Sequence, residues 1–316
     1  AEMTAAYCIQ GMINSEDDKL FIDTGGHCVS FKKAEKIWLE YLQNDKGMEF
    51  EKIKKFSELV RIAREKGLIK GLVIYKLEEN KVQRCIAENI CVLKGYLPVT
   101  REMYEYKSRA LSGEEGSGCF KGLGVEDITN RWSSNFEAQK WSIENQLPQF
   151  TRKGVFKDGG AYEYWQSQDY GIMKKYFFFN LDARDSKERP WYNKVMSYLE
   201  SPAIITGGWH KESFDVNVIS NFGHYYMVTA GATNLSFWAH VDVKPANMVM
   251  KQPGKNLELD RSKYYVMFQV SDGDAMRVLT SFECAHRHEE AAPWLSEDRG
   301  KVPIAWGTQP LAAELW

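Results

Sequence analysis

Two carboxylates around a glycine form the most chemically suggestive group in this sequence. In YYVMFQVSDGDAMRVL (264–279), Asp272 and Asp274 follow directly after a run of aromatic and β-branched residues. That run predicts a buried strand. Residues two positions apart in an extended chain point to the same side. Two carboxylates held this close favour keeping one of them protonated, which is what a general acid requires near neutral pH.

The four residues from Ser271 to Asp274 also suit a turn that leads into a helix. Gly273 would supply a positive φ, and Asp274 would cap a helix that starts at Ala275. On the residues alone, this structural interpretation is the better supported one. A Ca²⁺ loop is a weaker third interpretation, because the later bidentate Glu of such loops is missing at the required spacing.

A glycoside hydrolase needs a second carboxyl group on the other side of the scissile bond. The two groups stand about 5–5.5 Å apart in retaining enzymes and about 6.5–9.5 Å apart in inverting enzymes. Two candidates follow other predicted strands, namely Glu212 after IITGGW and Asp242 after SFWAHV. The sequence thus predicts a catalytic pair that joins Asp272 or Asp274 to Glu212 or Asp242.

Aromatic and polar residues near the same strand ends are candidates for substrate binding. Trp209 and Trp306 could stack on a sugar face, although a place in the core is as well supported for each. His210 follows Trp209 on a strand-end loop. Asn234 and His240 flank another apolar run, where the simpler interpretation is that they satisfy backbone groups.

Strands and helices alternate over the first two hundred residues, which predicts an α/β region with a partly parallel sheet. Apolar residues recur at helical spacing, and glycines stand where helices should end. The predicted helices cover 33–43, 50–67, 82–95 and, with Asp127 or Thr129 as the N-cap, 125–147; the predicted strands cover 19–23, 71–75, 96–99 and 175–182.

From about residue 200 the pattern changes to short apolar strands that run into polar or aromatic residues. A β/α barrel presents functional groups at its C-terminal face in this way. We therefore expect an N-terminal α/β region at 1–200, with subdivisions near 80 and 150. A TIM-barrel-like catalytic domain is expected to begin at 201 and to be incomplete at 316.

Composition narrows the range of partners. The net charge is −2 and no long basic run occurs, so no nucleic-acid footprint is predicted. The uncharged stretch 225–241 is too short and too polar for a membrane span. The six cysteines form no CxxC, and CAHRHEE (284–290) has poor zinc spacing, so no metal or other cofactor is predicted apart from the weak Ca²⁺ interpretation.

Several segments, taken in order, resemble the GxGYxYP family, to which glycoside hydrolysis is ascribed. The similar segments are spread over most of the chain, and none of them is specific by itself. They are CIQGMIN (8–14) with KLFID, GLVIY, IAENICVLKGYLPV, DITNRWSSNFEAQKW, GGWHKE (207–212), NLSFWAHV (234–241), YVMFQVSDGDAMRVL and VPIAWGTQPLAAEL.

The resemblance implies a multi-part α/β region followed by a TIM-barrel-like domain, and a carbohydrate substrate or ligand. It also implies an extracellular or surface location, while a cytoplasmic one stays open. Two departures stand out. The string GxGYxYP is absent and would lie beyond Trp316, and the usual SDGDN is SDGDA here, with Ala275 in place of Asn. A non-catalytic carbohydrate-binding or surface-interaction protein of the same fold is therefore the alternative to a glycoside hydrolase.

Overall fold

The computed structural model describes residues 1–16, 19–24, 34–77, 81–109, 118–159, 167–229 and 232–241, with short pieces at 261–264, 266, 268–270, 301 and 304–306. The chain is α/β, as the sequence predicts, and its described strands pair in parallel in three sheets. None of the described helices has the length and apolar character needed to span a bilayer.

The first sheet has three strands in the order β2-β1-β3, namely β2 (Tyr96–Val99), β1 (Gly71–Ile74) and β3 (Gly124–Asp127). All four residues of β1 are buried, which explains why its sequence is a continuous apolar run. The connections carry α4 (Val82–Lys94) and α5 (Arg101–Ser108), and α3 (Phe56–Glu65) precedes β1. Gly95 ends α4 in the left-handed region at φ 69°.

The second sheet has four strands in the order β5-β4-β6-β7. The chain forms β4 (Gly154–Lys157), adds β5 (Phe177–Phe179) on one side, and then returns to add β6 (Ile204–Gly207) and β7 (Tyr225–Val228) on the other. This reversal of strand order creates a switch point between β4 and β6, the place where open α/β sheets bind ligands. The accompanying helices are α6 (Asn135–Asn145), the 3-10 turn at Leu147–Gln149, α7 (Gln168–Met173), α8 (Arg189–Tyr198) and α9 (Glu212–Asn221).

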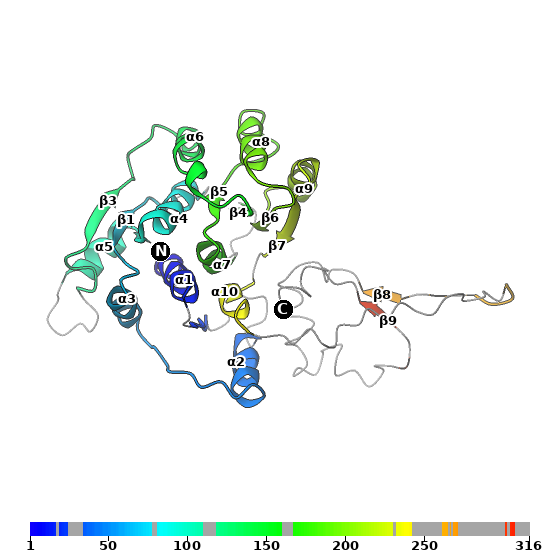
Figure 1. The fold of residues 1–316 in the computed structure, drawn as a ribbon, viewed down its shortest axis with the longest axis horizontal. Coiled ribbons are helices and arrows are strands. Elements are labelled where there is room, and N and C mark those ends of the chain that lie inside the picture. The colour runs from blue at the N-terminus through cyan, green and yellow to red at the C-terminus, as the bar shows by residue number, and fades with distance from the viewer. Residues whose placement is uncertain are drawn as a thin grey trace.

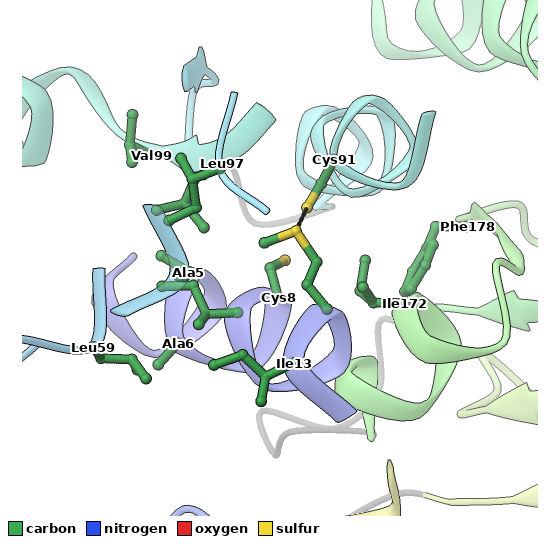
Figure 2. Packing of buried hydrophobic residues seen from close by; sticks show 14 of the residues in the cluster. Ala5, Ala6, Cys8, Ile13, Leu59, Cys91, Leu97, Val99, Ile172 and Phe178 are labelled. Atoms are coloured by element: carbon green, nitrogen blue, oxygen red, sulfur yellow. Dashed lines mark hydrogen bonds between the residues drawn. The ribbon is translucent and has the colours of Figure 1, made fainter. Parts of the chain in front are cut away.

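Helix α1 (Glu2–Asn14) lies at the centre of the molecule, between the two sheets (Figure 1). Its residues from Thr4 to Asn14 are all buried, and it packs against α7, β2, α3 and the short helix α10 (Leu235–Trp238). Figure 2 shows residues of α1, β2, α4 and α7 in one apolar cluster, in which the Cys91 Sγ lies 3.9 Å from the Met12 Sδ. One continuous core therefore joins both sheets.

The side chain of Asn89 on α4 completes the outer edge of β5. Its Oδ1 accepts from the Phe178 N–H at 2.7 Å, and its Nδ2 donates to the Phe178 carbonyl at 2.9 Å. These two bonds take the place of a neighbouring strand, because β5 pairs only with β4 among the described strands. They also fix α4, which belongs to the first sheet, against the second sheet.

Most predicted elements are confirmed, with α2 at Ala34–Asn44, α4 at Val82–Lys94, and strands β1, β2 and β5 within the predicted ranges. Helix α3 starts at Phe56, six residues later than predicted. Residues 124–127 form β3, and the helix that follows begins at Asn135 with Ser134 as its N-cap. The prediction of Asp127 or Thr129 as that N-cap was wrong.

Two other strand predictions were wrong. Residues 19–23 are not a strand, because side chains replace a neighbouring strand there: Asn14 bonds the backbone of Leu20, and Asn234 bonds that of Ile22. The apolar run at 235–238 is helix α10 and not a strand. A short run that is buried on all sides has no periodicity to separate the two structures.

A TIM barrel is not seen in the described residues, where all sheets are open. Strands β6 and β7 extend the same sheet as β4 and β5, so residue 200 falls within the span of one sheet. Later in the chain, β8 (Phe268–Val270) pairs in parallel with β9 (Ile304–Trp306).

We expect Asn89→Ala to lower the free energy of unfolding by about 2–4 kcal/mol, because it leaves two buried backbone groups of Phe178 unsatisfied. Urea denaturation followed by circular dichroism measures the loss. Asn145→Ala is the matched control, since the Asn145 side chain is exposed and donates only to the Trp141 carbonyl. Equal stability of the two variants would contradict the role of Asn89 at the sheet edge.

Candidate functional site

The carboxyl ends of β4 and β6 meet at the switch point of the second sheet. Lys157 ends β4, and Gly207 ends β6 beside it in the register of the sheet. The loops beyond them are in close contact. A Cβ on Gly207, whose φ is +106°, would lie 2.0 Å from the Lys157 carbonyl oxygen, and a Cβ on Gly159 would lie 2.3 Å from the Trp209 nitrogen. Glycine is thus required at both positions.

A buried ion pair lies directly under these loops. The side chains of Lys157 and Asp215 are 0% and 1% exposed, and Lys157 Nζ is 3.4 Å from Asp215 Oδ1. The other Asp215 oxygen accepts from the backbone N–H of His210 at 3.0 Å and of Lys211 at 3.2 Å. Burial lowers the pKa of Lys157, and Asp215 opposes that shift. One carboxylate from α9 therefore binds the end of β4 and also shapes the loop after β6.

His210 is half-buried above this pair, and its Nδ1 lies 2.9 Å from Lys157 Nζ. Burial and the adjacent Lys157 charge lower the pKa of His210 to about 3, so the ring is neutral at ordinary pH. Asp182 follows β5, and the hydrogen bonds from Arg184 lower its pKa to about 2. The Asp182 carboxylate is thus ionised and paired with the Arg184 guanidinium, whose Nη2 lies 2.6 Å away.

A second buried group of charges adjoins the first through Asp158, the residue after Lys157. Arg84 of α4 forms a close ion pair with Asp158, and Lys81 Nζ lies 3.9 Å from the other Asp158 oxygen. Glu88 lies one turn after Arg84, with its Oε1 3.7 Å from Arg84 Nε. Burial raises the pKa of Glu88 to about 8, against the effect of Arg84. The structure thus holds an uncharged carboxyl group near neutral pH behind the site.

Two of the residues predicted to bind substrate lie together at this switch point. Trp209 and His210 both follow β6, and both are half-buried. The Trp209 ring packs edge to face against Tyr226 of β7, with centroids 5.9 Å apart. A partly exposed aromatic ring beside a neutral imidazole is an arrangement that can stack on a ligand and bond its oxygen atoms.

Asn234 and His240 lie elsewhere, against α1. Asn234 Oδ1 accepts from Gln10 Nε2 at 2.6 Å and from the Ile22 N–H at 2.7 Å. His240 Nε2 lies 2.6 Å from the Asn14 carbonyl oxygen. These hydrogen bonds give both side chains a structural role. This agrees with the simpler interpretation, in which they satisfy backbone groups rather than bind substrate.

Glu212 is the first residue of α9 and is exposed. It lines a shallow surface depression of about 560 Å³ with neighbours on the same helix, including Asn217 and Ser220. A carboxylate in the first turn also interacts favourably with the helix dipole, so this position has a structural role as well. The structure does not bring Glu212 into the buried network of Lys157 and Asp215.

For the remaining predicted residues, the structure describes no side chain. Asp242, Asp272 and Asp274 are outside the described residues, and for Trp306 only the backbone is described, as the end of β9. In the described part of the chain, no three His, Cys, Asp or Glu side chains converge as metal ligands.

Lys157, Asp215 and the group around Arg84 were not among the residues predicted from the sequence. One signal was available, since GVFKDGG (154–160) puts a Lys and an Asp directly at the end of an apolar run and before two glycines. A lysine within such a run indicates either an edge position or a buried partner. Its partners, His210 and Asp215, are more than fifty residues away, and the local pattern does not identify them.

Comparison with known proteins adds a family and a fold. Residues 155–240, which contain the switch point, match the model of the GxGYxYP third domain. A crystal structure of a putative hydrolase from Bacteroides thetaiotaomicron VPI-5482 superposes with a TM-score of 0.77 at 19% identity. The match covers 99% of this chain and 56% of that chain, so this chain spans little more than half of that protein. No curated protein matches the sequence.

We expect the Glu88→Gln variant to lose a pH dependence of stability that the parent protein has. Because the folded pKa of Glu88 is about 8 and its usual value is 4.5, the folded state holds a proton that unfolding releases. The parent should therefore lose on the order of 1–2 kcal/mol of unfolding free energy between pH 6.5 and pH 8. This window lies above the titration of His210.

Urea denaturation at several pH values measures this slope in both proteins. Glu137→Gln serves as the control, because Glu137 is exposed in the first turn of α6 and is far along the chain from Arg84. Parallel pH profiles for the parent and Glu88→Gln would show that Glu88 is ionised in the fold, contrary to this expectation.

Proposed function

Because the chain belongs to the GxGYxYP family, we propose that it is a hydrolase that acts on carbohydrate, with its substrate held across the carboxyl edges of its parallel sheets. The observation that carries the proposal is the switch point, where Trp209 and His210 follow β6. There His210 contacts the buried ion pair of Lys157 and Asp215. The crystal structure with the similar fold is that of a putative hydrolase, which is consistent with this reaction class.

The chemistry of the described groups suits an uncharged, hydroxyl-rich ligand. Two cations at this edge have a carboxylate partner, since Lys157 pairs with Asp215 and Arg184 with Asp182. An ionic ligand would have to compete with these pairs, whereas a polyol adds hydrogen bonds without displacing charge. An aromatic ring such as Trp209 can pack on the apolar face of a sugar.

For the reaction itself we propose a carboxylate pair in which Asp272 or Asp274 acts with Glu212 or Asp242. Glycoside hydrolysis divides the work between a protonated and an ionised carboxyl group. Support comes from β8, which ends at Val270, two residues before Asp272, and pairs in parallel with β9. Val270 stands opposite Trp306 in that register, so the two carboxyl ends coincide. A barrel-like domain built on this strand pair remains part of the proposal.

An extracellular or surface location fits a glycan substrate and is proposed with it. Since the chain spans 56% of its structural neighbour, the complete site can draw on residues that this chain does not contain.

The second candidate function is carbohydrate binding without catalysis. Two observations favour it. Ala275 stands where the family pattern has Asn, and Glu212 is an exposed residue on a helix rather than part of a buried acid-base network. In this case Trp209 and His210 would bind the glycan, and Asp272 would be dispensable.

We expect Asp272→Asn and Glu212→Gln each to reduce turnover of a cleaved glycan by about 10²–10⁴-fold, as loss of an acid or base does. A panel of defined polysaccharides and oligosaccharides, with reducing-end release as the signal, identifies the substrate first. Glu200→Gln is the control, because Glu200 is an exposed carboxylate that pairs with Arg152.

The outcomes separate the two functions. Loss of turnover with unchanged thermal unfolding supports the hydrolase. Glycan binding without any cleavage by the parent chain or by the full-length protein supports the binding protein. Full turnover in both carboxylate variants would rule out this pair.

A further inference from the structure

The contact between Lys157 and His210 determines which ring nitrogen of His210 carries hydrogen. Lys157 Nζ lies 2.9 Å from His210 Nδ1 and 3.4 Å from Asp215 Oδ1. The Asp215 carboxylate favours the ammonium form of Lys157, which has three donors and no acceptor. His210 Nδ1 must then accept the hydrogen bond. In a neutral ring the hydrogen atom is therefore on Nε2.

The groups around His210 also oppose its protonation. Lys157 at the end of β4, Arg184 after β5 and Lys81 before α4 act as cations on the ring, and Asp182 alone among the four favours the imidazolium. The carboxylate of α9, Asp215, is already bound to Lys157 and to backbone N–H groups. The His210 ring therefore stays neutral over the ordinary pH range.

The other ring nitrogen, Nε2, makes no hydrogen bond with the described residues. The ring is half-buried at the switch point. A fixed N–H donor that has no acceptor in the described part of the chain, next in sequence to the partly exposed Trp209, is a group that a ligand can use.

We propose that Lys157 is a positioning residue that locks His210 in the neutral tautomer with hydrogen on Nε2, and that this N–H donates to an oxygen atom of an uncharged ligand. The choice of ligand rests on the proposed function, but the tautomer does not. In this arrangement His210 is a binding group that selects for an acceptor, and it is not a general base. Lys157 acts on the ligand only through His210.

Nuclear magnetic resonance of the whole chain with ¹⁵N-labelled histidine tests the tautomer. The chain has six histidines, and His210 is assigned by the signal that disappears in His210→Gln. We expect its Nε2 to be protonated and its Nδ1 to be bare, without change from pH 5 to pH 8. His224 is an internal reference, because its Nδ1 accepts from the Ala203 N–H at 3.3 Å and its Nε2 lies 3.0 Å from the Met196 carbonyl.

A hydrogen on Nδ1 of His210, or a titration of its ring near pH 6.5, would overturn the proposal.

The role of Lys157 is tested in Lys157→Met, which removes the donor to Nδ1. We expect a mixture of tautomers and a titration of His210 that moves toward its usual range. Since Lys157→Met leaves Asp215 buried without its partner, the double variant Lys157→Met/Asp215→Asn provides a second measurement in which no buried charge is left. Lys194→Met is the control, because Lys194 is exposed and contacts Trp191. An unchanged His210 spectrum in the double variant would show that Lys157 does not position the ring.

The donor role is tested by two substitutions at His210 in the glycan panel. Glutamine places an N–H group near the position of Nε2, whereas asparagine reaches only the position of Nδ1. We expect His210→Gln to stay within about threefold of the parent affinity and His210→Asn to lose about tenfold, near the value of one hydrogen bond. Equal losses in both variants would overturn the donor role. If no glycan binds the parent, the proposed function fails, while the spectrum still decides the tautomer.

Discussion

The ion pair between Arg84 and Asp158 holds the two sheets in a fixed relation. Arg84 lies on α4, which connects two strands of the first sheet, and Asp158 follows the first strand of the second. Both side chains are buried, so each charge depends on the other for its stability. Because Asp158 lies between Lys157 and Gly159, the same pair fixes the backbone at the switch point. The position of the proposed binding groups, Trp209 and His210, thus depends on a helix of the neighbouring sheet.

Local signals in the sequence predict elements that are bounded by glycines and have a single periodicity. Strand β1, helix α4 and strand β2 are of this kind, since an apolar run, a helical pattern and Gly95 follow one another. The prediction fails where tertiary partners replace local signals. Residues 19–23 do not form a strand, because their backbone N–H groups donate to the side-chain oxygens of Asn14 and Asn234. Asn234 is more than two hundred residues away in the sequence. The strand pattern also does not separate an open sheet from a closed barrel, because parallel sheets of both kinds share it.

The candidate site was predictable to the extent that parallel strands deliver residues to one edge. This rule places Trp209 and His210 at the carboxyl end of the strand before them, and the structure has both directly after β6. It could not identify Lys157 and Asp215. A buried charged residue can be predicted only when its partner in space is known, and its neighbours in the chain do not reveal that partner. For Asn234 and His240, the hydrogen bonds in the structure agree with the simpler interpretation, in which polar residues beside an apolar run satisfy backbone and side-chain groups.

The central position of α1 has a consequence for the order of folding. Its main partners are α7 and β2, with further contacts to α3 and α10, so they are spread from residue 56 to residue 238. During synthesis, α1 leaves the ribosome long before α7 and α10 exist, and its apolar surface stays uncovered for that time. Contacts of such long sequence separation slow folding and favour transient binding by chaperones. A helix that is made before its main partners is thus among the last to reach its final packing.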